Sequence, residues 1–480
     1  MSQRPVDASV RIVPMMCALL LADLTSTLEV SMLYSALPTI VRETGSISGA
    51  GWLITAYLLV QAGAAAIGGR LGDIFGRRKV LIGALILCAF GSATSAFASN
   101  LNWIIVGRAI QGASGAILPL CYGLVRENAP SDRSPFWVSV MSGAYALGGA
   151  FGFISGAAFS QYGHWQQVFY VTLILPMLAI AGVLLFVPKT VGRSVAGEID
   201  LLGGVLFVPA VTGILLAVSL GPTWGWTSPA TSGTLAASVL CLIGWAVYES
   251  RHRTPLIDVR LLGNRQIALS NGIYFCAGLG AVQIVLVLMM LMQQPSAVGV
   301  GLGLSAVTAA LWKLPGNLCS GAGGPLAGVI TKRLSARVAA IFGAAVQVVA
   351  WLLVIVDHRS MASVIAAMML SSFSSGVLLG AVPNLILEVA PPHRSSEATG
   401  ISSVTRAIAT AIGTQLMTSV LASSSVVLDG HKYPSEGSYL LAFWLITGVS
   451  SVAILLAIAL PRRGMPRSVT TAVRAAQQRS

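Results

Sequence analysis

Charge is scarce in this 480-residue sequence, because only 9% of its residues are Asp, Glu, Lys or Arg, against about a quarter in soluble proteins. This scarcity excludes an ordinary soluble domain. Hydrophobic residues make up 55% of the chain, and they occur in blocks of about 20, long enough to cross the hydrocarbon core of a bilayer as helices. The composition therefore predicts an all-α protein embedded in a lipid bilayer.

The sequence also lacks the motifs of several other function classes. It has no Walker motif, metal-ligand cluster or nucleophile triad, so we expect no enzyme activity, no cofactor, no bound metal and no use of ATP. The six cysteines show no C-x-x-C spacing and are interpreted as small hydrophobic residues. The formal net charge is +13, but the basic residues lie in short clusters between apolar blocks, so no nucleic-acid partner is expected.

Apolar runs bounded by charge, proline or glycine predict fourteen membrane-spanning helices. The predicted spans lie near residues 13–37, 51–69, 80–98, 102–125, 136–158, 167–187, 201–221, 231–248, 267–292, 302–330, 338–356, 361–387, 399–424 and 438–460. Two long polar stretches bracket the seventh and eighth spans. We therefore expect a six-helix bundle (residues 1–190), an inserted helix pair (191–254) and a second six-helix bundle with a tail (255–480).

Lysine and arginine are distributed unevenly over the gaps between these spans. One set of alternate gaps, together with both tails, is assigned 24 of them, Arg406 included, and the opposite gaps hold 3. Because positive charge concentrates on the cytoplasmic side, this asymmetry predicts a multi-pass protein of the inner (cytoplasmic) membrane with both termini in the cytoplasm. Only Arg108 and Lys313 are counted as lying within spans.

The loop between the second and third predicted spans carries a spaced motif, G-x-L-x-D-x-x-G-R-R. Its positions are Gly69, Leu71, Asp73, Gly76, Arg77 and Arg78. The glycines allow close helix approach and a tight turn, while Asp73 can accept hydrogen bonds from a neighbouring helix N-terminus and from the arginines. A turn that only carries cytoplasmic positive charge would explain the arginines alone. The motif resembles the signature loop of the major facilitator superfamily, and we expect it to latch the cytoplasmic side.

Other motifs extend this resemblance over nearly the whole chain. They include Asp200–Gly203, Pro255–Leu262 and Arg394–Gly400, which resemble the fourteen-helix drug:proton antiporters. The stretch Gly299–Ser305 with Leu314–Gly316 is most similar to actinobacterial members. The resemblance implies the major facilitator fold, with two six-helix bundles, an inserted helix pair and a transport pathway between the bundles. It also implies that a functional monomer uses the proton gradient to move a small-molecule substrate.

Glu29 and Arg108 are the leading candidates for proton coupling. Glu29 stands where the antiporters have Asp in a helix-1 element, and a carboxyl in a low-dielectric cavity can load and release a proton near neutral pH. Asp23 is a second candidate carboxyl. Arg108 begins an R-x-x-Q-G element, and an arginine within a span is functional by default. The alternatives are a structural partner role for Glu29 and a snorkelling side chain for Arg108.

Three glycines in the fifth predicted span, Gly148, Gly152 and Gly156, recur every four residues and predict a smooth face for close helix packing. This segment resembles the G-x-x-x-G-P-x-x-G-G signature of the antiporters. Phe153 replaces the proline of that signature, which is associated with export. The direction of transport is therefore left open, and a generic packing face is the alternative.

Several polar residues are candidates for the lining of a substrate cavity. Lys313, two residues before Pro315, either faces the cavity and favours anionic or polar cargo or snorkels to the periplasmic interface. The other candidates are Tyr34, Gln111, Asn317 and Asn384. Two functions remain: proton-driven efflux of amphipathic small molecules or drugs, and, because of Phe153 and Lys313, a non-export carrier of a polar or anionic metabolite.

Overall fold

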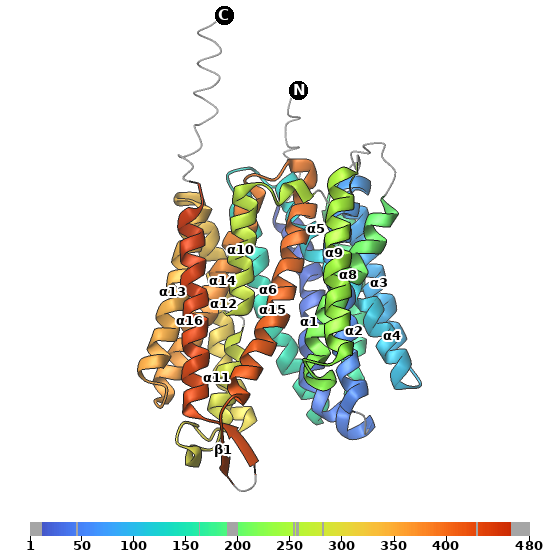
Figure 1. Ribbon diagram of the computed structural model, residues 1–480. Coiled ribbons are helices and arrows are strands. Elements are labelled where there is room, and N and C mark those ends of the chain that lie inside the picture. The colour runs from blue at the N-terminus through green and yellow to red at the C-terminus, as the bar shows by residue number, and fades with distance from the viewer. Residues whose placement is uncertain are drawn as a thin grey trace, which may run out of the picture.

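The computed structural model describes residues 12–44, 47–162, 164–189, 200–252, 255, 259–280, 283–428 and 431–461. Within this part of the chain, long helices lie roughly side by side and one short hairpin projects from one end (Figure 1). Helix α1 begins and α16 ends at the same end of the bundle (Figure 1). A chain that crosses the membrane an even number of times has its first helix begin and its last helix end on the same side, as α1 and α16 do here.

The first helical bundle is formed by the amino-terminal helices. They are α1 (Ile12–Thr44), α2 (Ile47–Phe75), α3 (Arg77–Ala96), α4 (Leu101–Gln111), α5 (Ile117–Asn128), α6 (Ser134–Tyr162) and α7 (Gln167–Phe186). The 3-10 turn η1 (Gly112–Ala116) joins α4 to α5, so that Leu101–Asn128 forms one long span. The Asn100 side chain starts this span by accepting a hydrogen bond from Trp103 N at 3.1 Å.

A helix pair and a second bundle follow. The pair is α8 (Leu201–Trp224) and α9 (Pro229–Arg251). The second bundle consists of α10 (Arg265–Leu279), α11 (Ile284–Gln293), α12 (Ala306–Arg333), α13 (Ala336–Val356), α14 (Met361–Leu387), α15 (Ser395–Ala422) and α16 (Glu436–Ala459), with the 3-10 turns η2 (Val259–Leu261), η4 (Ser296–Val298) and η5 (Pro392–Arg394). Strands β1 (Ser425–Leu428) and β2 (His431–Pro434) form an antiparallel hairpin before α16.

Eleven helices in the described residues are long and apolar enough to cross a membrane. The other three predicted spans coincide with α10 and α11 together, α12 and α15. The span that corresponds to α10 and α11 is divided near Gly280, and the span that corresponds to α15 contains Arg406. The count of fourteen crossings therefore stays a prediction, and so do the part boundaries near 190 and 254, which adjoin residues outside the described ranges.

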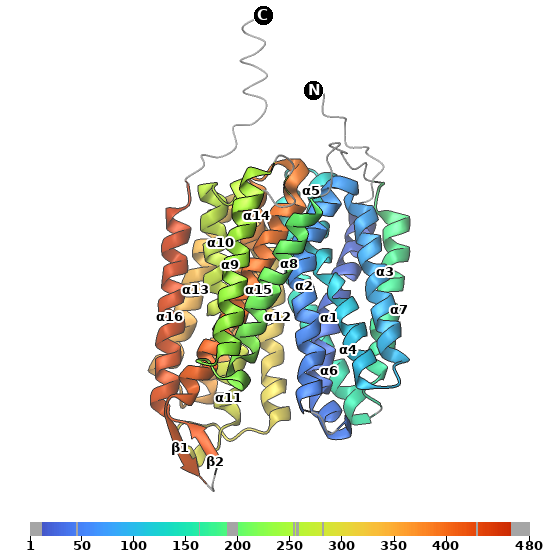
Figure 2. The same cartoon turned by 45° about the vertical axis from the view of Figure 1, so that its right-hand side comes forward.

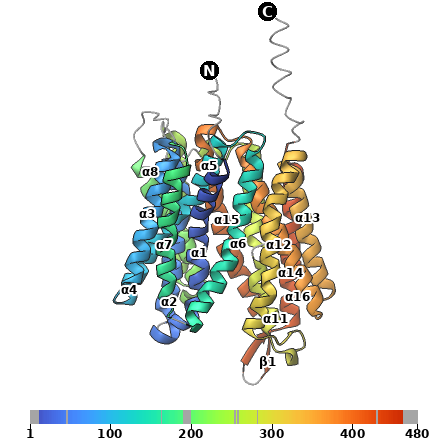
Figure 3. The same ribbon diagram turned by 180° about the vertical axis from the view of Figure 1, so that it is seen from behind.

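The two bundles meet along two helix pairs. Helix α6 packs against α12, and α2 packs against α15; Figure 3 shows α6 and α12 together between the bundles. The α8–α9 pair lies along this seam, with α8 against both α2 and α15 (Figure 2). Each bundle has apolar clusters of its own, centred for example on Leu85 and Ile117 in the first and on Val377 and Ile386 in the second. The surface between the bundles is where a transport site is expected.

Candidate functional site

The predicted loop motif joins the two bundles at one end. Asp73, only 8% exposed, accepts a hydrogen bond from Arg77 Nε at 2.8 Å and another from the Glu397 backbone N–H at 3.0 Å. Glu397 lies in the first turn of α15, whose free N–H groups favour a carboxylate. The expected contact of Asp73 with a helix N-terminus and with an arginine is thus present, and that helix belongs to the opposite bundle.

Arg77 extends this junction. Its Nη2 donates to the Pro392 carbonyl at 2.8 Å across the bundles, while Nη1 donates to the Gly123 carbonyl at 3.0 Å and to Glu127 Oε2 at 3.2 Å within its own bundle. Gly76, with φ of 99°, makes the turn that brings Arg77 back over Asp73, a backbone conformation that favours glycine. Arg77 is therefore held from both sides of the seam.

Further hydrogen bonds cross the seam at the same end. Arg70 Nη1 reaches Glu397 Oε2 at 3.3 Å, and Arg126 Nη1 reaches Ser395 Oγ at 2.7 Å. Gly69 allows α2 and α15 to approach, because a Cβ there would collide with the Ser396 carbonyl. We call this set the latch: Arg70, Asp73, Arg77 and Arg126 from the first bundle with Pro392, Ser395 and Glu397 from the second.

Two predicted residues have other roles than expected. Arg78, predicted as part of the latch, donates to the Leu184 carbonyl at 2.7 Å and so ties α3 to the end of α7 within one bundle. Asn384, predicted to line a cavity, is 4% exposed and donates to Ser139 Oγ at 2.9 Å and to the Pro135 carbonyl at 3.1 Å. Asn384 thus adds to the contact between α14 and α6 beside the latch.

Arg108 is buried inside the first bundle, at 2% exposure, and does not snorkel to an interface. Its guanidinium lies over the Tyr57 ring, 4.3 Å from the centroid, and donates to Gln111 Oε1 at 2.8 Å. It also donates to the backbone carbonyls of Leu53 and Glu29, both at 3.2 Å. One arginine thereby connects α1, α2 and α4 through neutral acceptors.

Gln111 belongs to the same network rather than to a cavity lining. Its Nε2 donates to Ser92 Oγ at 2.6 Å, and Ser92 donates in turn to the Thr172 carbonyl at 2.9 Å. The chain of hydrogen bonds therefore runs from Arg108 to α3 and α7. Such a connected buried network holds its members in one arrangement.

The carboxyl groups of Glu29 and Asp23 are fully buried on α1. In the described residues, neither carboxyl has a partner at ordinary hydrogen-bond distance, although the Ser114 hydroxyl is near enough to the Glu29 carboxyl to interact with it. Arg108 contacts the backbone carbonyl of Glu29 and leaves the Glu29 carboxyl unbonded, although the two groups are close enough to interact electrostatically. A buried carboxyl with so few donors is costly to keep charged, so it is suited to carry a proton.

The glycine face of α6 packs against α1. A Cβ at Gly148 would contact Leu24 and Thr27, one at Gly152 would contact Ser31 and Leu28, and one at Gly156 would collide with the Met32 carbonyl and Ser35 Oγ. The predicted close-packing face is therefore present. It lies within the first bundle, beside the segment of α1 that carries Glu29.

Lys313 and Phe153 meet at the other side of α6. The Lys313 ammonium nitrogen on α12 lies 4.7 Å from the centroid of the Phe153 ring, so a cation–π contact joins the two bundles. Lys313 is half-buried there, as is Asn317 one turn further along α12. Tyr34 on α1 is 40% exposed. These three residues lie outside the pocket described next.

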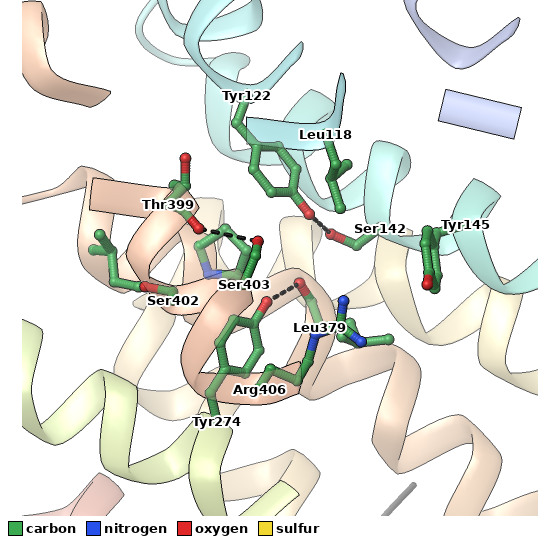
Figure 4. A pocket seen from close by; sticks show the side chains of 12 residues that line it. Leu118, Tyr122, Ser142, Tyr145, Tyr274, Leu379, Thr399, Ser402, Ser403 and Arg406 are labelled. Atoms are coloured by element: carbon green, nitrogen blue, oxygen red, sulfur yellow. Dashed lines mark hydrogen bonds between the residues drawn. The ribbon is translucent and has the colours of Figure 1, made fainter. Parts of the chain in front are cut away.

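A pocket between the bundles lies beside the latch (Figure 4). It is lined by Leu118, Tyr122, Ser142 and Tyr145 from the first bundle and by Tyr274, Leu379, Pro383, Ile386, Thr399, Ser402, Ser403 and Arg406 from the second. None of the five predicted cavity residues is in this lining. The assignment of Arg406 to a cytoplasmic gap was wrong, since it lies well inside α15, as the predicted span at 399–424 already implied.

The fold and the seam define a class of protein: two helical bundles that hold a pocket between them and are joined at one end by a charged latch, as in membrane transporters. The sequence model of the Major Facilitator Superfamily matches residues 19–414 and, in a second match, 317–479. The chain belongs to this superfamily of transporters and is a multi-pass membrane protein, not an enzyme.

The sequence is similar to curated relatives from bacteria and fungi. It is 28% identical over 267 residues to the multidrug transporter protein MdtP of Bacillus subtilis, covering 55% of this chain and 49% of that protein. It is 30% identical over 260 residues to the efflux pump FUS6 of Gibberella moniliformis, covering 52% and 46%. The chain thus spans about half the length of the curated relatives it matches.

Solved structures share the fold. The human organic anion transporter MFSD10 superposes with a TM-score of 0.66 at 15% identity, covering 95% of this chain and 100% of that one. The proton:xylose symporter XylE superposes with a TM-score of 0.64 at 16% identity, covering 94% and 96%. At these identities the likeness concerns the fold alone.

Proposed function

We propose that this protein is a proton-coupled efflux transporter for amphipathic small molecules or drugs, working by alternating access. The observation that carries the proposal is the enclosed Glu29 carboxyl, which lies beside the Arg108 network and near enough to the Ser114 hydroxyl to interact with it. A proton that binds Glu29 changes the charge next to an arginine that connects three helices. Protonation can therefore favour one arrangement of the first bundle over another.

The seam between the bundles supports alternating access. Interbundle hydrogen bonds gather at the latch, and the pocket lies next to it on the same helices, α5 and α15. Opening the latch would connect the pocket with the solution at that end. By the distribution of lysine and arginine we assign that end to the cytoplasm of an inner-membrane protein with fourteen crossings and both termini on that side. By its resemblance to the antiporters we infer a functional monomer.

The names of similar proteins support efflux. One relative is named a multidrug transporter and another an efflux pump. The replacement of the export-associated proline by Phe153 leaves a second candidate, a non-export carrier of a polar or anionic metabolite. The observation that favours this candidate is the presence of two cations, Lys313 and Arg406, on the side of the second bundle that faces the first.

The two functions are distinguished by transport measurements. Cells that express the protein are loaded with ethidium, and efflux is followed with and without a protonophore. We expect gradient-dependent efflux that Glu29→Gln abolishes, while exchange of ethidium across proteoliposomes without a gradient persists. Glu436→Gln serves as the control, because Glu436 pairs with Arg359 at 2.9 Å at the exposed start of α16.

Efflux that ignores the protonophore, or that survives Glu29→Gln with its gradient dependence intact, would contradict proton coupling at Glu29. Uptake of carboxylate solutes into proteoliposomes without any ethidium efflux would favour the second candidate.

A further inference from the structure

We propose that the pocket at Arg406, whose cavity volume of about 10 Å³ admits a water-sized group in this arrangement, binds the anionic group of the transported molecule, and that the rings of Tyr145, Tyr122 and Tyr274 contact its apolar body once the bundles separate. This inference rests on the proposed transport function and adds a substrate class to it: amphipathic monoanions that carry a carboxylate, sulfonate or phosphate.

Charge is the first argument. Of the twelve described residues that line the pocket, Arg406 is the one charged residue, and no acidic side chain is among them. A cation enclosed between two helical bundles without a lining carboxylate attracts an anion more strongly than an exposed cation does, because little water screens it. The pocket thus has a single fixed positive charge.

The orientation of Arg406 is the second argument. Its guanidinium carbon lies 5.7 Å from the centroid of the Tyr145 ring, so α15 reaches across the seam to α6 (Figure 4). The Tyr145 hydroxyl also interacts with the Arg406 guanidinium. A guanidinium has five N–H donors, so the others can form the paired hydrogen bonds that carboxylates and phosphates accept. Tyr145 therefore positions Arg406 for such a ligand.

The lining hydroxyl groups are already occupied by the protein. Tyr274 donates to the Leu379 carbonyl at 3.3 Å, Ser403 donates to the Thr399 carbonyl at 3.1 Å, and the Tyr122 and Ser142 hydroxyls are 2.7 Å apart (Figure 4). A ligand thus meets the rings rather than new hydroxyl donors. Arg406 therefore selects for the negative charge of the ligand, and the tyrosine rings provide an apolar surface that suits the aromatic or aliphatic part of the ligand.

Asp23 gives the proposal a test of opposite sign. Its carboxyl on α1 has no hydrogen-bond partner in the described residues and interacts electrostatically with Arg406. Once it has lost its proton, Asp23 opposes a bound anion, so at alkaline pH Asp23→Asn should strengthen anion binding, whereas loss of Arg406 should weaken it at every pH. Damage to the fold would weaken binding in both variants.

Binding is measured with the full chain in lipid nanodiscs, using three fluorescent probes with the same dansyl group. Dansyl-phenylalanine is an anion, dansyl-phenylalaninamide is its uncharged analogue, and dansylcadaverine is a cation. We expect the wild type to bind the acid about tenfold more tightly than the amide, as a charge-assisted hydrogen bond provides. Arg406→Gln should abolish this difference and leave the affinity for the amide unchanged, while Arg406→Lys should keep part of it.

Two further variants complete the design. At alkaline pH, Asp23→Asn should raise the affinity for the acid about two- to fivefold. Arg133→Gln removes an exposed cation that pairs with Asp132 at 3.9 Å and should leave the ratio of acid to amide affinity unchanged. If Arg406→Gln keeps the wild-type ratio, or if the wild type binds the amide or dansylcadaverine as tightly as the acid or binds none of the probes, the proposal is overturned.

The binding experiment and the efflux experiment can fail independently, so a failure of the proposed pump function can be told apart from a failure of the proposed binding site. A wild type that prefers the acid through Arg406 but drives no gradient-dependent efflux would support the binding site and contradict the pump.

Discussion

Lys313 on α12 and Phe153 on α6 face each other across the two bundles, with the ammonium nitrogen 4.7 Å from the ring centroid. Phe153 stands at the proline position of the antiporter signature that this segment resembles, and Lys313 is a cation within a predicted span, so two unusual residues of the sequence contact each other. Both lie in the half of their helices remote from the latch. This contact is placed to hold the bundles together in that half.

Phe153→Leu should loosen this half of the seam. A cation–π contact contributes about 0.5–2 kcal/mol, so its loss should raise the population with separated bundles by about two- to thirtyfold. Spin labels at the exposed positions Ile154 and Leu311, which lie on α6 and α12, would report a longer distance distribution. Phe153→Tyr keeps the ring and is the control. An unchanged distribution in Phe153→Leu would show that the contact does not hold the bundles.

Asp73→Asn should open the latch. The substitution removes the buried carboxylate that pairs with Arg77 and leaves Arg77 with the partly exposed Glu127 carboxylate at 3.2 Å, so the loss should lie below the about 3–5 kcal/mol of a fully broken buried ion pair. In a cysteine-free protein with Ser403→Cys in the pocket lining, a water-soluble maleimide added at the latch end should label more than tenfold faster.

Arg78→Gln is the matched control for this experiment, because Arg78 contacts Leu184 in its own bundle. Equal acceleration by Arg78→Gln and Asp73→Asn would mean that the positive charge of the loop, and not the Asp73 contact, closes this end.

The latch could be predicted from sequence more fully than the pocket. Asp73 and Gly76 occur in one short loop, so the turn at Gly76 could be predicted locally, and the structure shows it. The sequence also predicted that Asp73 accepts from a helix N-terminus, but that this helix is α15 of the opposite bundle follows only from the structure. The pocket combines residues from α5, α6, α10, α14 and α15 that are far apart in the chain. Counting charges by gaps placed Arg406 outside a helix although the predicted span 399–424 contains it, and its contact with Tyr145 follows only from the packing of the two bundles. Asn384 was recognised as a polar residue in a span, but its partners on α6 follow only from the packing of the bundles.

Gly156→Ala should destabilise the protein, whereas Gly83→Ala should not. A methyl group at Gly156 would collide with the Met32 carbonyl and Ser35 Oγ, while one at Gly83 meets nothing within 4 Å. Overpacking costs about 1–3 kcal/mol, and alanine in an open helical position gains up to about 1 kcal/mol over glycine. Thermal unfolding in detergent should therefore give a lower midpoint for Gly156→Ala and an equal or higher one for Gly83→Ala. Equal midpoints for both variants would mean that α1 and α6 are not closely packed at Gly156.

Arg108→Lys should abolish coupled transport even though the positive charge remains. The guanidinium reaches the Leu53 and Glu29 carbonyls and Gln111 at once, and a lysine ammonium is a point charge that cannot span three acceptors in this plane. We expect gradient-driven efflux to fall at least about tenfold, since two or more hydrogen bonds to a charged group are lost, with a smaller change in gradient-independent exchange. The measurement compares both rates in proteoliposomes for the wild type, Arg108→Lys and Arg133→Lys. Wild-type coupling in Arg108→Lys would show that charge alone suffices at this position and that the connection of α1, α2 and α4 through Arg108 plays no part in coupling.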